Sequence, residues 1–130
     1  MTVTPRFDAI GLVVSDMAAS LAFYRRLGLD VPPEADSAPH AEAVLPGGLR
    51  MMWDTEEAVR AYTDLDDAPA GDRTALAFRC AAPAEVDALY GDLVAAGYRG
   101  HRAPWGAPWG QRYAVVLDPD GRGVDLFADA

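Results

Sequence analysis

The stretch FDAIGLVVSDMAASLAFYRRLG, residues 7–28, combines a strand, a helix start and a helix stop. Residues 7–14 form an apolar run rich in β-branched side chains, which is typical of a strand. Ser15 and Asp16 are residue types that cap helix N-termini, and Gly28 ends the helical pattern that follows them. The stretch therefore predicts a strand that leads directly into a helix from Met17 to Leu27.

The same order of signals returns in the second half of the chain. Residues 74–80 are strand-like, Pro83 suits the first turn of a helix, and Gly97 suits its end. Between these two residues the apolar side chains recur at helical spacing, namely Val86, Leu89, Tyr90, Leu93 and Val94. The second half thus repeats the first, which predicts a duplicated fold.

Each predicted helix is followed by short strands joined by a turn. Residues 41–45 and 49–53 flank Pro46-Gly47, and residues 112–117 and 123–127 flank the turn at 118–121. We expect a single domain over residues 1–130, with module 1 at about 5–54, module 2 at about 74–130, and a connector at 55–73. Acidic residues are frequent in this connector, which carries a predicted short helix from Glu56 to Tyr62.

Composition and charge exclude several classes of protein. The 130 residues are 51% hydrophobic and 24% charged, which is globular, and no apolar run is long enough for a membrane helix. The N-terminus lacks the pattern of a signal peptide, so we expect a cytoplasmic protein. All eleven basic residues are arginine against twenty acids, and the net charge of −9 opposes binding to nucleic acid or to anionic membranes. The single Cys80 excludes an internal disulfide and predicts a small core residue.

The opening and closing segments resemble a known superfamily. Residues 9–16 and 20–28 resemble the opening of the vicinal oxygen chelate superfamily, which includes glyoxalase I, extradiol dioxygenases, fosfomycin resistance enzymes and bleomycin resistance proteins. Residues 108–113, followed by 118–121, are similar to the ending of its bleomycin resistance branch. The resemblance implies an α+β fold of two βαβββ modules whose mixed sheets curl into a cup, completed by a second subunit in a homodimer.

The resemblance also implies where a metal would bind. The four ligand positions of the metal-using members fall on Ala9, Ala75, Met52 and Asp125. Of these, Asp125 alone offers an oxygen to a hard cation, and a divalent ion needs several such ligands. We therefore expect no metal, no cofactor and no catalytic residue, with Asp125 as the acid to watch. His40 and His101 are interpreted as exposed or capping side chains.

The last hairpin indicates which face of the sheet lines the cup. If Asp118 pairs with Gly121 across a two-residue turn, one face carries Arg112, Ala114, Val116, Gly123, Asp125 and Phe127. This mixed set suits a cavity wall, whereas the other face is apolar and belongs under the helices: Tyr113, Val115, Leu117, Val124 and Leu126. A slip of one residue at the turn would exchange the two faces. The same alternation in two other strands adds Arg50, Met52, Asp54, Ala75, Ala77 and Arg79 to the cavity side.

Charges and aromatic rings suggest what the cup binds. We expect the cavity arginines to form ion pairs with Asp54 and Asp125, and any arginine left over is a candidate for a ligand carboxylate, phenolate or carbonyl. Trp105 and Trp109 lie in a Pro- and Gly-rich segment, interpreted as a loop, where they would stack on a planar ligand.

The sequence thus favours a metal-free binding protein that sequesters a small aromatic or amphipathic molecule, as in bleomycin-type antibiotic resistance. Its predicted ligand-binding residues are Trp109, Trp105, Arg112, Asp125, Met52, Arg50, Arg79 and Phe127. The net charge favours a cationic ligand and the arginines an acidic one, so the ligand's charge stays open. Two alternatives also stay open: an enzyme of the same fold, either a glyoxalase-type lyase or isomerase or a metal-free catalyst using Asp125, and an accessory domain without a ligand.

Overall fold

The computed structural model describes residues 8–61 and 76–130. The chain divides into two compact units, Met1–Pro69 and Ala70–Ala130, so that the division falls within the predicted connector. Each unit is considered by itself. Of the connector, residues 62–73 lie outside the described residues, as does Ala75.

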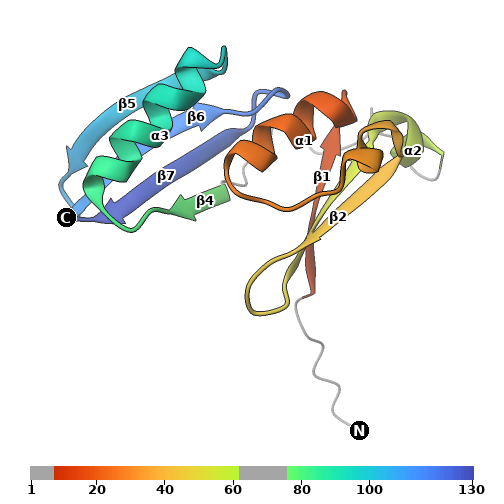
Figure 1. Ribbon diagram of the computed structural model, residues 1–130, viewed down its shortest axis with the longest axis horizontal. Helices are drawn as coiled ribbons and strands as arrows, with labels where there is room; N and C mark the ends of the chain where they lie inside the picture. The colour runs from red at the N-terminus through yellow and green to blue at the C-terminus, as the bar shows by residue number, and fades with distance from the viewer. Residues whose placement is uncertain (1–7, 62–75) are drawn as a thin grey trace, which may run out of the picture. The chain divides into compact units, whose positions relative to one another are not determined.

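The first unit is a three-stranded mixed sheet with helices (Figure 1). The strand order is β1-β3-β2, with β1 parallel to β3 and β2 antiparallel to it. The elements are β1 (Ala9–Val14), α1 (Met17–Arg26), the 3-10 helix η1 (Pro33–Ser37), β2 (His40–Val44), β3 (Arg50–Thr55) and α2 (Glu56–Arg60).

Helix α1 begins at the predicted Met17 and ends at Arg26, one residue before the predicted end. The Asp16 side chain accepts a hydrogen bond of 3.0 Å from the backbone N–H of Ala19, which satisfies one of the donors left open at a helix start. Gly28 follows the last turn with a φ of 92°, a conformation that favours glycine. The helix buries Phe23 and Tyr24, and the Tyr24 ring lies 5.6 Å from that of Trp53 on β3.

Burial alternates along the strands of this sheet as expected. Met51 and Trp53 are buried on the side of α1, whereas Arg50, Met52 and Asp54 are half-buried on the opposite side. The predicted assignment of β3 residues to the two faces is therefore confirmed.

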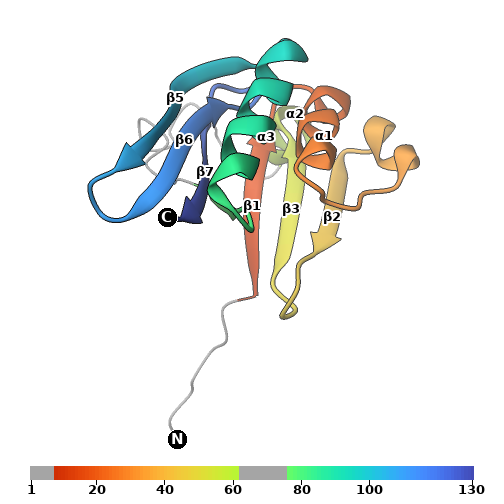
Figure 2. The ribbon, with the colours of Figure 1, turned by 60° about the vertical axis from the view of Figure 1, so that its left-hand side comes forward.

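The second unit is a four-stranded mixed sheet with one helix against it (Figure 1 and Figure 2). The strand order is β4-β7-β6-β5, with β4 parallel to β7 and the other pairs antiparallel. The elements are β4 (Leu76–Arg79), α3 (Pro83–Ala95), β5 (Arg99–Ala107), β6 (Gln111–Leu117) and β7 (Gly123–Asp129). The buried core of the unit includes Val86, Leu93, Ala107, Ala114, Val116, Val124, Leu126 and Ala128.

The two units share one plan, because in each the first strand lies parallel to the last strand of the sheet. This confirms the predicted α+β fold with mixed sheets. Within the described residues the βαβββ order is complete in the second unit, whereas the first has β1, α1, β2 and β3. No described helix is long and apolar enough to cross a membrane.

The segment before the last hairpin is a strand, which corrects the predicted loop. Residues 103–107 belong to β5 although Pro104 and Gly106 are residues that usually break strands. The strand tolerates them because it lies at the edge of the sheet and its pairing with β6 is interrupted by irregularities between Gly100 and Arg102 and between Arg102 and Trp105. Trp105 therefore lies on a strand, and Trp109 lies in the turn that follows it.

The register of the last hairpin differs by one residue from the predicted one. The backbone N–H of Asp118 donates to the carbonyl of Arg122 at 2.9 Å, so the loop holds three residues instead of two. Tyr113 consequently pairs with Phe127, and Val115 pairs with Asp125. Arg112, Ala114 and Val116 are thereby moved to the face that α3 covers, and the predicted placement of these three residues on the cavity side was wrong.

Candidate functional site

An aromatic row crosses the face of the second sheet that lies opposite α3. Directly paired residues on neighbouring strands share a face, and the register aligns Arg79, Phe127, Tyr113 and Trp105 across β4, β7, β6 and β5. We use the name aromatic row for Phe127, Tyr113 and Trp105 together with Trp109, whose ring joins them from the turn after β5. The row thus brings together three of the predicted ligand-binding residues, Trp105, Trp109 and Phe127.

The rings of the aromatic row contact one another in order. Tyr113 and Phe127 are 6.0 Å apart with their planes inclined by 26°. Trp105 and Trp109 meet the Tyr113 ring edge to face at 5.6 and 5.4 Å, and lie 6.0 Å from each other. Such arrangements are the ones aromatic pairs prefer. Trp109 nevertheless keeps 59% of its surface exposed, so the row presents an aromatic surface.

Polar side chains fix one end of the aromatic row. The Trp109 indole N–H donates to Gln111 at 3.0 Å, and the Gln111 amide donates to Asp129 at 3.1 Å. Arg79 pairs with the same Asp129 at 3.0 Å while its guanidinium lies 4.8 Å from the centre of the Phe127 ring. The hydrogen bond from Gln111 and the contact with Arg79 lower the pKa of Asp129. These contacts link the Trp109 and Phe127 rings through Asp129.

Tyr113 and Asp125 form a tight polar pair beside the rings. The Tyr113 hydroxyl donates to the Asp125 carboxylate at 2.5 Å. Burial, followed by this hydrogen bond and the negative charge of Asp125, raises the pKa of Tyr113 to about 12. The phenol therefore stays protonated near neutral pH and acts as a hydrogen-bond donor.

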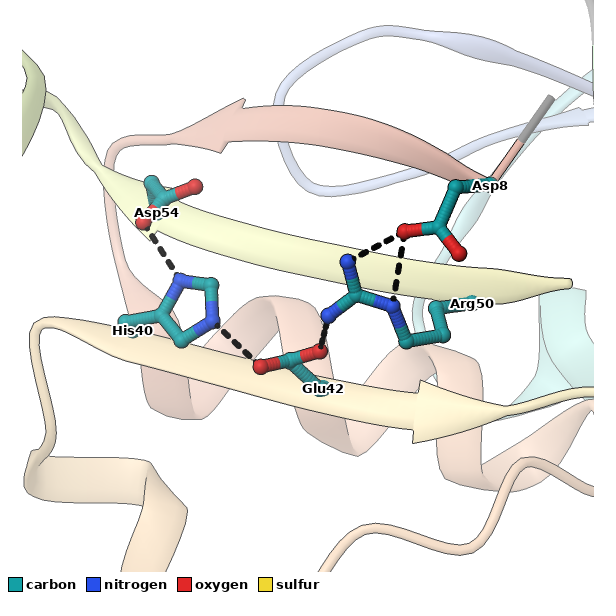
Figure 3. A network of polar contacts seen from close by, with 5 residues as sticks. All are labelled: Asp8, His40, Glu42, Arg50 and Asp54. Atoms are coloured by element: carbon teal, nitrogen blue, oxygen red, sulfur yellow. Dashed lines mark hydrogen bonds and ion pairs between the residues drawn. The ribbon is translucent and has the colours of Figure 1, made fainter. Parts of the chain in front are cut away.

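The equivalent face of the first sheet carries a chain of charged contacts (Figure 3). We use the name charged ladder for its five members, Asp8, His40, Glu42, Arg50 and Asp54. His40 lies between two acids, with Nδ1 2.7 Å from Asp54 and Nε2 3.0 Å from Glu42. Arg50 contacts the other carboxylate oxygen of Glu42 and reaches Asp8 at 2.6 Å.

Hydrogen bonding within the charged ladder sets its protonation. The bonds to Glu42 and then to Asp54 raise the pKa of His40, and the bond from His40 lowers the pKa of Glu42. Arg50 has its pKa raised by Asp8 and Glu42. Sequence reasoning correctly gave His40 an exposed position, but it missed these partners, because they become visible only from the pairing of β2 with β3.

The residues at the superfamily's metal positions do not fit a chelated divalent ion. Ala9 has no ligand atom and pairs with Arg50, while the Met52 thioether lies next to Gly11. Asp125 is engaged by Tyr113, and Ala75, which also lacks a ligand atom, lies outside the described residues. Among residues 8–61 and 76–130, no three His, Cys, Asp or Glu side chains gather in a way suited to a metal.

The predicted site residues thus fall into three groups. Trp105, Trp109, Phe127, Arg79 and Asp125 come together on the open face of the second sheet. Arg50 and Met52 lie on the open face of the first sheet. Arg112 instead faces α3, where it pairs with Asp87 at 2.9 Å.

Two further residues on the second sheet escaped the sequence analysis. Tyr113 was assigned to the core because the hairpin was predicted one residue out of register. Arg102, whose guanidinium lies 3.8 Å from the centre of the Trp105 ring, was missed because β5 was not recognised as a strand. Cys80 was predicted to be a core residue but is half-buried, and burial raises the pKa of its thiol.

Comparison with solved structures supports the fold. A glyoxalase/bleomycin resistance protein/dioxygenase family enzyme from Burkholderia phytofirmans is 20% identical, with a TM-score of 0.81 over 97% of this chain and 100% of that one. A protein from Nocardioides with the same family description is 26% identical, with a TM-score of 0.74 over 99% and 86% of the two chains. A lactoylglutathione lyase from Agrobacterium tumefaciens is 18% identical, with a TM-score of 0.69 over 98% and 96%.

A search of curated proteins gave no match. The family profile of the Glyoxalase/Bleomycin resistance protein/Dioxygenase superfamily, by contrast, matches residues 6–126, which is nearly the whole chain. The duplicated plan of the two units and the solved structures agree with this match. The chain therefore belongs to the glyoxalase/bleomycin resistance protein/dioxygenase superfamily.

Proposed function

We propose that this protein binds a planar aromatic or amphipathic small molecule on the aromatic row and sequesters it without a metal, as a resistance protein of the bleomycin type would. The observation that carries the proposal is the aromatic row itself, in which Trp109 is 59% exposed and Trp105, Tyr113 and Phe127 are half-buried. Sequestration requires a binding surface and no bond chemistry.

The position of the rings supports this proposal over a purely structural role. The core of the second unit is closed on the other side of the sheet, between α3 and residues such as Val116 and Leu126. The aromatic row lies outside that core, although exposed aromatic surface is unfavourable in water. A flat ligand would cover the rings and remove apolar area from solvent, which contributes roughly 25 cal/mol per Å².

Titration against a panel of planar antibiotics and dyes tests the proposal. Calorimetry should detect binding of at least one member, and Trp109→Ala or Trp105→Ala should weaken it by about 1–3 kcal/mol if stacking provides the affinity. Val94→Ala is the matched control, because Val94 is a 42% exposed apolar side chain on α3, away from the rings. Equal affinity in the tryptophan variants and the wild type would contradict the proposal, as would a panel without any binder.

The Tyr113–Asp125 pair favours a second candidate, a metal-free enzyme of the same superfamily. The Asp125 carboxylate accepts at 2.5 Å from a phenol that stays protonated, and it keeps further lone pairs with which it is suited to accept a substrate proton. Metal analysis of the purified protein, with nickel, zinc, manganese and iron each offered in excess, distinguishes this candidate from a metal-dependent enzyme. Stoichiometric binding that Asp125→Ala abolishes would contradict both metal-free proposals.

A further inference from the structure

The arginines that the sequence placed in the site are already neutralised by acids of the same unit. Arg79 pairs with Asp129 at 3.0 Å, and Arg112 pairs with Asp87 at 2.9 Å. Arg50 is held between Asp8 and Glu42 in the charged ladder (Figure 3). The charge of each of these three arginines is thus balanced by at least one carboxylate.

Arg102 differs from these arginines. It lies on β5, its side chain is exposed, and its guanidinium carbon is 3.8 Å from the centre of the Trp105 ring. Within the described part of the chain, no carboxylate forms an ion pair with it. Arg102 is therefore a cation fixed on the aromatic row by a ring and not by an acid.

Stacking leaves the hydrogen-bonding capacity of a guanidinium intact. The N–H groups of arginine lie in the plane of the guanidinium and point outward from its edge, so a ring that contacts its face does not consume them. A planar fork held in one orientation is suited to a carboxylate, which accepts two parallel hydrogen bonds. Arg102 thus offers a pre-oriented anion-binding group next to the rings.

The register fixes the polarity of the neighbouring surface. Arg102 pairs with Val115 on β6, and Val115 pairs with Asp125 on β7, so that a half-buried valine separates the cation from the acid. Across the row an anionic group would be attracted at the β5 end and repelled at the β7 end. The strand spacing of about 4.8 Å places the two charged positions roughly 10 Å apart at the backbone, a span that suits a fused-ring molecule.

We propose that Arg102 binds an anionic group of the ligand, and that the molecule sequestered on the aromatic row is a planar aromatic carboxylate. This inference rests on the proposed function. It decides a choice that the sequence left open, because the net charge of −9 favours a cation at long range. At contact distance the groups that matter are those on the row, and there Arg102 is a cation whose charge no acid of the described residues balances.

Three isosteric probes test the inference: 2-naphthoate, the neutral 2-naphthamide and the cationic 2-naphthamidine. Calorimetry should show that wild-type protein binds the naphthoate about tenfold more tightly than the amide, since a hydrogen bond to a charged group contributes at least about 1.5 kcal/mol. Arg102→Gln should remove this preference, so that the naphthoate and the amide bind to the variant with similar affinity. Arg99→Gln is the matched control, because Arg99 is an exposed arginine of the same strand for which the structure shows no ring contact.

The possible failures are distinguishable. If the amide binds and Trp109→Ala weakens it, but the naphthoate shows no preference, the inference is wrong and the proposed function stands. A preference that persists in Arg102→Gln, or that Arg99→Gln removes equally, also overturns the role of Arg102. If none of the probes binds to a variant or to the wild type, the proposed function and the inference fail together. Thermal unfolding of each variant verifies that it is folded.

Discussion

Tyr113 connects the aromatic row to the Asp125 carboxylate. Its ring contacts those of Trp105, Trp109 and Phe127, and its hydroxyl donates to Asp125. A phenylalanine would supply the ring contacts alone, and the Asp125 carboxylate would then lose its hydrogen-bond donor. Tyrosine suits this place because it combines an apolar ring with a polar end.

The raised pKa of Tyr113 gives a pH prediction. Its hydroxyl should ionise near pH 12, above the ordinary value of 10, because burial and the nearby Asp125 disfavour the phenolate. The stability that this shift contributes is present below pH 10 and is lost as the pH rises toward 12. The near-ultraviolet absorbance of tyrosinate measures the titration.

Two variants test whether the absorbance change near pH 12 comes from Tyr113. Tyr113→Phe should remove the late phase from the absorbance titration. Asp125→Asn should shift it toward lower pH, because the negative charge beside the phenol is gone. A titration that is identical in the wild type and in Asp125→Asn would show that Asp125 does not act on Tyr113.

At the scale of elements, the turn between β6 and β7 decides which residues form the site. The Asp118 carboxylate is almost completely buried and accepts from the backbone N–H groups of Asp120 and Arg122 at 3.0 and 2.8 Å. It also pairs with the Arg122 guanidinium at 2.6 Å. These bonds stabilise a three-residue loop and so place Tyr113 and Asp125 on the open face.

Asp118→Ala should therefore lower the free energy of unfolding by about 1–3 kcal/mol, since it leaves buried donors without an acceptor. Urea denaturation measures the change. Asp118→Asn is the matched variant, because its amide oxygen can still accept from the two backbone N–H groups while the charge facing Arg122 is lost. An unfolding midpoint for Asp118→Ala equal to that of the wild type would contradict this account of the turn.

The charged ladder makes the β2–β3 pairing sensitive to pH. The hydrogen bonds of His40 to Glu42 and Asp54 favour the protonated imidazole and raise the pKa of His40 above 6.5. The stabilisation that they provide is complete below pH 6.5 and is lost as the pH rises through the raised pKa of the folded state. Asp54→Asn and Glu42→Gln should each lower the pKa of His40.

Nuclear magnetic resonance of the imidazole protons measures this pKa directly. His101→Gln removes the other imidazole, so that the remaining signal belongs to His40. If the pKa of His40 were the same in the wild type and in the Glu42→Gln variant, the ladder would not control its protonation.

The elements that could be predicted from sequence are those with local signals. Asp16 and Gly28 mark the ends of α1, and alternating burial on β3 follows from the period of a strand. The edge strand β5 could not be predicted, since its pairing with β6 tolerates Pro104 through local irregularities. The register of β6 and β7 depends on how the Asp118 side chain hydrogen-bonds to the backbone of the turn. The predicted register was one residue out, so the prediction placed Arg112 in the site where the structure has Tyr113.

At the scale of the whole molecule, the two units have the same plan and different chemistry. The open face of the first sheet is occupied by the charged ladder, in which acids and bases are paired. The open face of the second sheet carries the aromatic row, with Arg102 and Asp125 beside it. Duplication thus provided two similar sheets, of which the second is the better candidate for holding an apolar ligand.

We expect the protein to form a homodimer, because open sheet faces and strand edges leave surface that a second copy can cover. Light scattering at micromolar concentration should then give a particle of twice the 13.9 kDa chain mass. Dilution should not change the mass until the concentration falls below the dissociation constant. Particles of the single-chain mass throughout would contradict the prediction.

The irregular outer strand β5 has a consequence for how copies of this chain can meet. Pro104 lacks an N–H, and the shifts beside Arg102 break the even spacing of backbone groups that an added strand would require. This border is a poor template for fibril growth from one molecule to the next. A second copy that approached here would have to adhere through its side chains, which leaves this edge of the sheet closed to extension.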